Sequence, residues 1–152
     1  MKHWLFALIF IFSISCDDPK DEEIDCSLYD PFLSNLIIEL VNDQGENLIA
    51  NNTYLADEIT VSFNGYISTN VVFNNVPGLE NVITINLFGT SGDNTFMIHL
   101  SDTVSDTLVL NLSVDMSVCN IPLYTLNQAT YNGEIQMVSQ NDSGNYRITV
   151  AK

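Results

Sequence analysis

The sequence predicts an all-β protein, most simply an antiparallel β-sandwich of about eight strands. From residue 33 onward, apolar residues recur at every second position, which is the period of a strand with one buried face. Residues that favour turns separate these apolar runs. No run of ten or more residues combines helical apolar spacing with a capping residue, so we expect little helix. Strands with one apolar face fit two packed sheets.

The expected strands follow from the alternating segments taken in order. In the clearest one, Leu108, Leu110 and Leu112 alternate with polar or smaller residues. In another, Ile135 and Met137 are expected to share the buried face. The segments lie at residues 36–40, 59–63, 83–87, 96–100, 108–114, 129–138 and 146–150. Turns are expected at residues 42–45, 64–65, 77–78, 91–94 and 141–144, and also at 132–133, within the segment 129–138.

Part of the domain resembles a known family of sandwiches. Residues 41–49 read VNDQGENLI, and Ile59-Thr60-Val61 follows after a gap. This resembles the opening of carboxypeptidase-regulatory-like, transthyretin-like modules, and residues 75–78 are similar to their later Pro-Gly turn. The chain departs from the family at residues 50–58, where an insertion replaces the usual Pro-Gly-Ala step. The resemblance implies a non-catalytic accessory module, and we expect an immunoglobulin-like or transthyretin-like sandwich.

Residues 1–15 have the organisation of a signal peptide. Lys2 provides an early positive charge, and an apolar run extends from Trp4 to Ile14. This run is about half of the roughly 20 residues that a membrane-spanning helix needs, which favours a cleaved signal over a permanent span.

The end of this segment, Ser13-Ile14-Ser15-Cys16, resembles the lipobox of bacterial lipoproteins. That family most often has Leu where Ser13 stands, and looser versions occur in the Bacteroidetes. The resemblance implies acylation of Cys16, which then becomes the mature N-terminus and attaches the protein to a membrane. A plainly cleaved secretory signal is the alternative. Two or three acyl chains on one cysteine are sufficient for stable anchoring.

The residues after Cys16 predict an extended acidic linker over 16–25. The sequence DDPKDEE at residues 17–23 is charged and broken by proline, so it has nothing to bury. It resembles the export signal that follows the acylated cysteine in surface-exposed Bacteroidetes lipoproteins. We therefore expect an outer-membrane lipoprotein that faces the cell surface. A spacer with no addressing role, on a protein that faces the periplasm, is the alternative.

The two remaining cysteines, Cys26 and Cys119, are expected to form a disulfide in this oxidising compartment. Two separate buried thiols are the alternative. The pair falls short of a zinc site, because His99 is the only histidine of the mature chain. The single β-sandwich domain is expected to span residues 26–152.

Charge excludes nucleic acid as a partner. All 19 acidic residues follow Cys16, while only Lys20, Arg147 and Lys152 are basic there. Binding to a phosphate backbone requires a patch of lysine and arginine. Partners are expected to be the membrane, through the anchor on Cys16, and protein or glycan ligands.

No group of residues indicates catalysis, a cofactor or a metal. His99 is expected to be an exposed strand residue, because sequence alone places no Ser or Asp beside it. Carboxylate pairs of a hydrolase remain an alternative, since many acids are available. The turn at Asp43, Gln44 and Glu46, and that at Asp93 and Asn94, offer oxygen ligands for calcium without the spacing of an EF-hand. Possible sugar platforms are Tyr54, Tyr66, Tyr124 and Tyr131.

Two short motifs indicate a modification. Asp102-Thr103-Val104 and Asp106-Thr107-Leu108 resemble the acceptor of general O-glycosylation in exported Bacteroidetes proteins. The resemblance implies glycans on Thr103 and Thr107, which are expected to share one turn. A polar hairpin connection is the alternative.

The sequence thus predicts a lipid-anchored, non-catalytic module that binds a partner or has a structural role. A glycan-binding accessory lipoprotein of an uptake system and a carboxylate-based hydrolase are the two alternatives.

Overall fold

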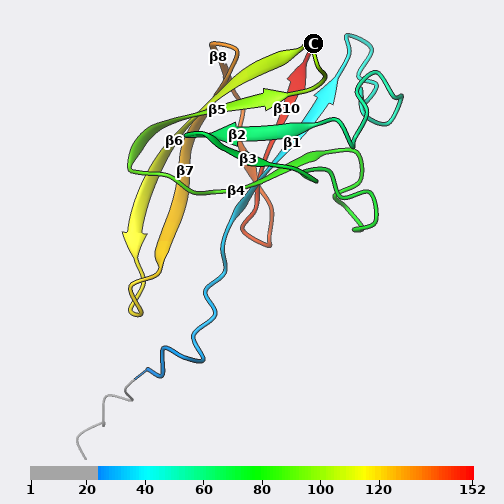
Figure 1. Ribbon diagram of the computed structural model, residues 1–152. Coiled ribbons are helices and arrows are strands. Elements are labelled where there is room, and N and C mark those ends of the chain that lie inside the picture. The colour runs from blue at the N-terminus through cyan, green and yellow to red at the C-terminus, as the bar shows by residue number, and fades with distance from the viewer. Residues whose placement is uncertain (1–23) are drawn as a thin grey trace, which may run out of the picture.

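The computed structural model describes residues 24–152, which form ten strands and no helix (Figure 1). The predicted signal peptide, Cys16 and all but the end of the acidic linker lie outside the described residues. The strands are β1 (Asn35–Val41), β2 (Thr60–Phe63), β3 (Tyr66–Ser68), β4 (Ile83–Asn86), β5 (Gly92–His99), β6 (Ser105–Met116), β7 (Pro122–Tyr131), β8 (Glu134–Gln136), β9 (Ser139–Gln140) and β10 (Tyr146–Ala151).

The strands form two sheets around one core, as the alternating pattern predicted. One sheet has four strands in the order β4-β1-β10-β9, and the other has six in the order β3-β2-β5-β6-β7-β8. Side chains from both sheets meet in a single apolar cluster, in which Ile38 of β1 and Phe96 of β5 are fully buried. The all-β prediction is therefore confirmed, and the two sheets pack as in a β-sandwich.

The four-stranded sheet corrects the expectation that all pairing is antiparallel. Strands β1 and β10 run parallel, with Leu36 beside Tyr146 and Val41 beside Ala151. The N–H of Lys152 extends the pair by donating to the carbonyl of Val41. Alternation shows which face of a strand is buried and says nothing about its direction, so the sequence pattern did not distinguish a parallel partner from an antiparallel one.

The segment predicted at residues 129–138 is also corrected. Asn132 and Gly133 form the turn expected there, between β7 and β8, and both have positive φ, 48° and 86°. After this turn Ile135 and Met137 are exposed, Met137 to 92%. They lie beyond the core because β8 is a short edge strand. Short strands at sheet edges, β3, β8 and β9, also explain why ten strands form where about eight were expected.

One buried polar side chain lacks a hydrogen-bond partner within residues 24–152. The hydroxyl of Thr84, in β4, is buried and has no hydrogen-bond partner among the described residues. A buried polar group without a partner costs about 1–3 kcal/mol. Because valine has nearly the same shape and no hydroxyl, we expect Thr84→Val to raise the free energy of unfolding by about 1 kcal/mol. Urea unfolding measures this difference.

Thr95→Val is the matched control for this prediction. Thr95 also lies within a strand, β5, but is exposed. Its hydroxyl is free to bond water, so the change in stability is expected to be within about 0.5 kcal/mol. Equal effects of the two substitutions would show that the buried hydroxyl carries no cost.

Candidate functional site

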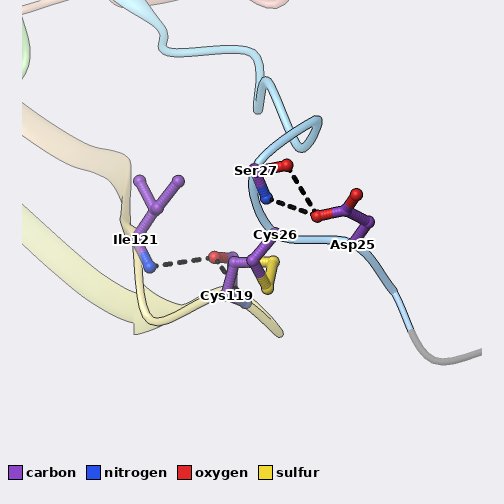
Figure 2. Close-up of a disulfide and its surroundings, with 6 residues drawn as sticks. Asp25, Cys26, Ser27, Cys119 and Ile121 are labelled. Atoms are coloured by element: carbon purple, nitrogen blue, oxygen red, sulfur yellow. Dashed lines mark hydrogen bonds between the residues drawn. A yellow bond between two sulfur atoms is a disulfide. The ribbon is translucent and has the colours of Figure 1, made fainter.

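The predicted disulfide is present and lies at one end of the molecule. Cys26 and Cys119 are bonded, with their Cα atoms 5.4 Å apart across a sequence separation of 93 residues (Figure 2). Cys119 lies in the turn between β6 and β7, where the backbone N–H of Ile121 donates to Ser117 Oγ over 3.0 Å. On the other side, Asp25 accepts hydrogen bonds from the N–H and the hydroxyl of Ser27. The bond fastens the start of the described chain to the tip of the β6–β7 hairpin.

The segment between Cys26 and β1 has few other attachments. Leu28 and Phe32 are both exposed, Leu28 to 82%. In Figure 1 this segment runs in the same direction as the long β6–β7 hairpin, away from the other strands. The disulfide therefore sets where the chain toward Cys16 leaves the domain.

The two proposed glycosylation motifs lie in different settings. Thr103 is exposed in the turn between β5 and β6, as expected. Asp106 and Thr107 belong to β6 itself, and Asp106 is only 6% exposed. The expectation that both motifs share one turn is wrong, because the strand begins at Ser105 and turns the carboxylate of Asp106 inward.

Asp106 is the centre of a polar cluster that sequence reasoning missed. Its carboxylate accepts hydrogen bonds from the Tyr131 hydroxyl over 2.7 Å and from Asn132 Nδ2 over 2.8 Å. It also forms an ion pair with the ammonium of Lys152. The same ammonium lies 5.4 Å from the centre of the Tyr54 ring. The cluster joins β6 and β7 of one sheet to the end of β10 in the other.

The charges in this cluster hold the carboxylate ionised. Burial by itself raises the pKa of Asp106, but hydrogen bonds from Lys152, Asn132 and Tyr131 outweigh it and leave the pKa below its ordinary value. Burial and the bond to Asp106 raise the pKa of Tyr131, so its phenol stays protonated. All of these groups are occupied by one another, which fits a structural role better than a reactive one.

His99 is partly buried between two serines, rather than exposed as expected. It is the last residue of β5, where its Nε2 lies 3.1 Å from Ser62 Oγ and its Nδ1 lies 2.8 Å from Ser105 Oγ. Both ring nitrogens thus contact hydroxyls, and no carboxylate is among the hydrogen-bond partners described for the ring. A catalytic triad needs an acid to orient the imidazole.

The loops considered for calcium are held by their own side chains. Asn42 Oδ1 accepts hydrogen bonds from the N–H groups of Gln44 and Glu46. Asp93 accepts one from Asn111 Nδ2 over 2.6 Å, and lies within β5 rather than in a turn. No group of three or more His, Cys, Asp and Glu suited to a metal is found over residues 24–152.

The four tyrosines do not gather on one face. Tyr131 is buried in the Asp106 cluster, and Tyr54 and Tyr124 are half-buried. Tyr66 alone is exposed among the four, to 79%, and it lies on β3, at the opposite side of the six-stranded sheet from β7.

Tyr66 borders a pocket between the two sheets. Strands β3 and β4 each lie at an edge of their sheet, and residues 69–82 connect them. The Thr84 N–H donates to the carbonyl of Val71 over 2.8 Å, which ties this segment to β4. The cavity so enclosed has a volume of about 260 Å³.

The pocket combines an aromatic floor with a neutral polar rim. Phe63 and Phe88 line it and pack at a right angle, with ring centres 5.1 Å apart. Both rings also pack on Phe96 in the core. Its polar lining is neutral: the exposed Ser68, Thr69, Asn70 and Asn86 form the rim, and the buried Thr84 also contributes.

A scan against protein-family models finds no match to this chain, and searches of curated proteins and of solved structures find none either.

One sequence signal coincides with the pocket. In this acidic chain, Glu80 is the only charged residue from residue 59 to residue 92. Every residue that lines the pocket lies within that stretch. The lack of charge was present in the sequence, but only the fold shows that it surrounds a cavity.

A second cavity lies beside the Asp106 cluster. Its lining includes Glu134 and Lys152, so a single carboxylate residue faces it. Neither of these two cavities is lined by the pair of carboxylates that a glycoside hydrolase uses. Within residues 24–152, no helix is long and apolar enough to cross a membrane.

Proposed function

We propose that this chain is a lipid-anchored, non-catalytic β-sandwich of immunoglobulin-like or transthyretin-like type. It serves as a binding or structural module of the outer membrane and faces the cell surface. The acyl chains are carried by Cys16, and the acidic residues after it form the linker.

The position of the disulfide is the observation that carries this proposal. About ten residues separate Cys16 from Cys26, and a chain of that length reaches at most about 36 Å. Because Cys26 is bonded to Cys119, an anchor on Cys16 holds the β6–β7 tip, and not a loose tail, near the membrane. The disulfide therefore determines which end of the domain lies nearest the anchor.

A non-catalytic role is supported by the way the reactive side chains are used. His99 contacts two serines, and Asp106 is neutralised by Lys152. The hydrolase alternative needs two carboxylates that face each other across a cleft, and the two cavities described above do not supply them.

The glycan-binding alternative gains support from the neutral pocket beside Tyr66. The tyrosines considered as sugar platforms do not gather on one face, so within residues 24–152 the support for this role comes from the pocket. We keep this role as the second candidate.

Cys16→Ser tests the anchoring step. We expect the variant to lose labelling by radioactive palmitate and to leave the membrane fraction, because serine is not a substrate for acylation at this position. Ser13→Leu is the matched control: it brings the motif closer to the common lipobox and is expected to keep both the label and the membrane location. Unlabelled wild-type protein, or membrane-bound Cys16→Ser, would contradict the proposal.

A further inference from the structure

We propose that the pocket between β3 and β4 binds one ring of a neutral sugar. This inference deepens the binding role proposed above by naming the ligand class and the residues that contact it. It does not depend on the lipid anchor.

The chemistry of the lining selects a neutral ligand. No lysine, arginine, aspartate or glutamate lines the pocket. An anion finds no cation there and is repelled by the formal net charge of −15. A cation finds no carboxylate in the pocket to compensate for the water it gives up on binding.

The mixture of side chains selects a ligand with both apolar and hydroxyl-rich surfaces. Phe63, Phe88 and Tyr66 offer aromatic faces on which the C–H groups of a pyranose ring pack. Asn70 and Asn86 offer amides that both donate and accept hydrogen bonds, as hydroxyl groups require. A hydrocarbon chain would make no use of these amides, which are both exposed.

The size and the opening of the pocket fit a single ring. Its volume of about 260 Å³ lies just below the roughly 300–1,000 Å³ that is typical of sites for drug-sized molecules. Tyr66 is 79% exposed at its border, so a longer glycan can extend past the ring without entering the core.

The backbone at the rim is also fixed by the sequence. Asn70 has a φ of 55°, in the left-handed region that asparagine tolerates better than most residues. The next residue, Val71, is held by the bond from the Thr84 N–H. The rim is therefore positioned before any ligand binds, which reduces the entropy lost on binding.

Chemical-shift mapping of the full-length protein tests the proposal. The ¹⁵N-labelled protein, in a detergent without a sugar headgroup, is titrated with methyl glycosides of glucose, galactose, mannose and N-acetylglucosamine. We expect at least one of them to shift the amide signals of residues 66–73 and 84–88 saturably, with a millimolar dissociation constant. Glucuronic acid, which is negatively charged, is expected to shift none of them.

Tyr66→Ala and Ile67→Ala form a matched pair for this experiment. Both residues are exposed on β3, at 79% and 67%, but only Tyr66 lines the pocket. We expect Tyr66→Ala to weaken binding roughly tenfold and Ile67→Ala to leave it unchanged. Asn70→Gly, which keeps the positive φ and removes the amide, is expected to weaken it as well.

Three results would overturn the proposal. One is the absence of saturable shifts with every neutral glycoside. The second is a shift of the same amides by p-cresol while the sugars have no effect, which would make this an aromatic-binding pocket. The third is equal weakening by Tyr66→Ala and Ile67→Ala. None of these results changes the palmitate labelling at Cys16, so failure of the sugar site is distinguishable from failure of the lipid anchor.

Discussion

Asp106→Asn is expected to lower the free energy of unfolding by about 3 kcal/mol, the largest effect we expect of a single substitution. The carboxylate accepts hydrogen bonds from Tyr131 and Asn132 and pairs with Lys152. Asparagine removes the negative charge and brings an N–H₂ group against donors that need an acceptor. Breaking a buried ion pair from one side typically costs about 3–5 kcal/mol, and the partial exposure of Lys152 places this pair at the lower end.

Asp102→Asn provides the comparison for this substitution. Asp102 lies only four residues away, in the exposed turn between β5 and β6. Its replacement is expected to change the free energy of unfolding by less than about 0.5 kcal/mol in urea titrations at neutral pH. If Asp106→Asn were as mild as Asp102→Asn, the cluster would not lock the two sheets together.

The effect of Asp106→Asn is also expected to depend on pH. The pKa of Asp106 is lower in the folded protein than the ordinary Asp value of about 4. A group with a lowered folded pKa stabilises the protein above the unfolded pKa, and this stability is lost as the pH falls through the folded pKa. The difference between wild type and Asp106→Asn should therefore be full at pH 7 and shrink in strong acid. A difference that grew on acidification would contradict the assignment.

Removal of the disulfide is expected to lower the free energy of unfolding by about 2 kcal/mol. Chain-entropy arguments assign about 4–5 kcal/mol to a bond that closes a loop of 93 residues. In this protein the exposed segment between Cys26 and β1 also regains freedom in the folded state once the bond is cut. This gain equals the entropy of closing a short loop, and it offsets part of the entropy of closing the long loop in the unfolded chain. About half of the 4–5 kcal/mol then remains.

The double variant Cys26→Ser/Cys119→Ser measures this effect without a leftover thiol. Urea unfolding of this variant should agree with that of the wild type under reducing agent. The reducing agent should in turn leave the stability of the double variant unchanged. A loss near 5 kcal/mol would show that the segment before β1 is packed far more firmly than its exposure indicates.

The sequence pattern was sufficient for the class of fold and for most of the core. Alternation identified Leu108, Leu110 and Leu112 as an inward face, and all three are buried. It failed after Tyr131, where the apolar pattern continues through Ile135 on the short edge strand β8 and Met137 just after it, and both side chains are exposed. A two-residue period reports the geometry of a strand but not whether a second sheet covers it.

Some of the candidate site residues could likewise be predicted from the sequence, and others could not. The cysteine pair was predictable, because an even pair of cysteines in a chain that is expected to be exported favours a disulfide. The Asp106 cluster was not, since it joins residues of β6 and β7 to Lys152, just after β10, and only the fold brings these together. The pocket was not predictable either, because it forms where the chain passes from the edge strand β3 to the edge strand β4. The sequence signal that coincides with it is the scarcity of charged residues between residues 59 and 92.

Intact-mass analysis of protein purified from its native membrane, with and without reduction, tests the central claim most directly. A lipid-anchored, disulfide-fastened module predicts a chain that begins at Cys16, carries the mass of two or three acyl chains and gains two hydrogen atoms on reduction. Protease added to whole cells should then remove the domain. An unacylated chain would contradict the lipid anchor, and a mass unchanged by reduction would contradict the bond between Cys26 and Cys119.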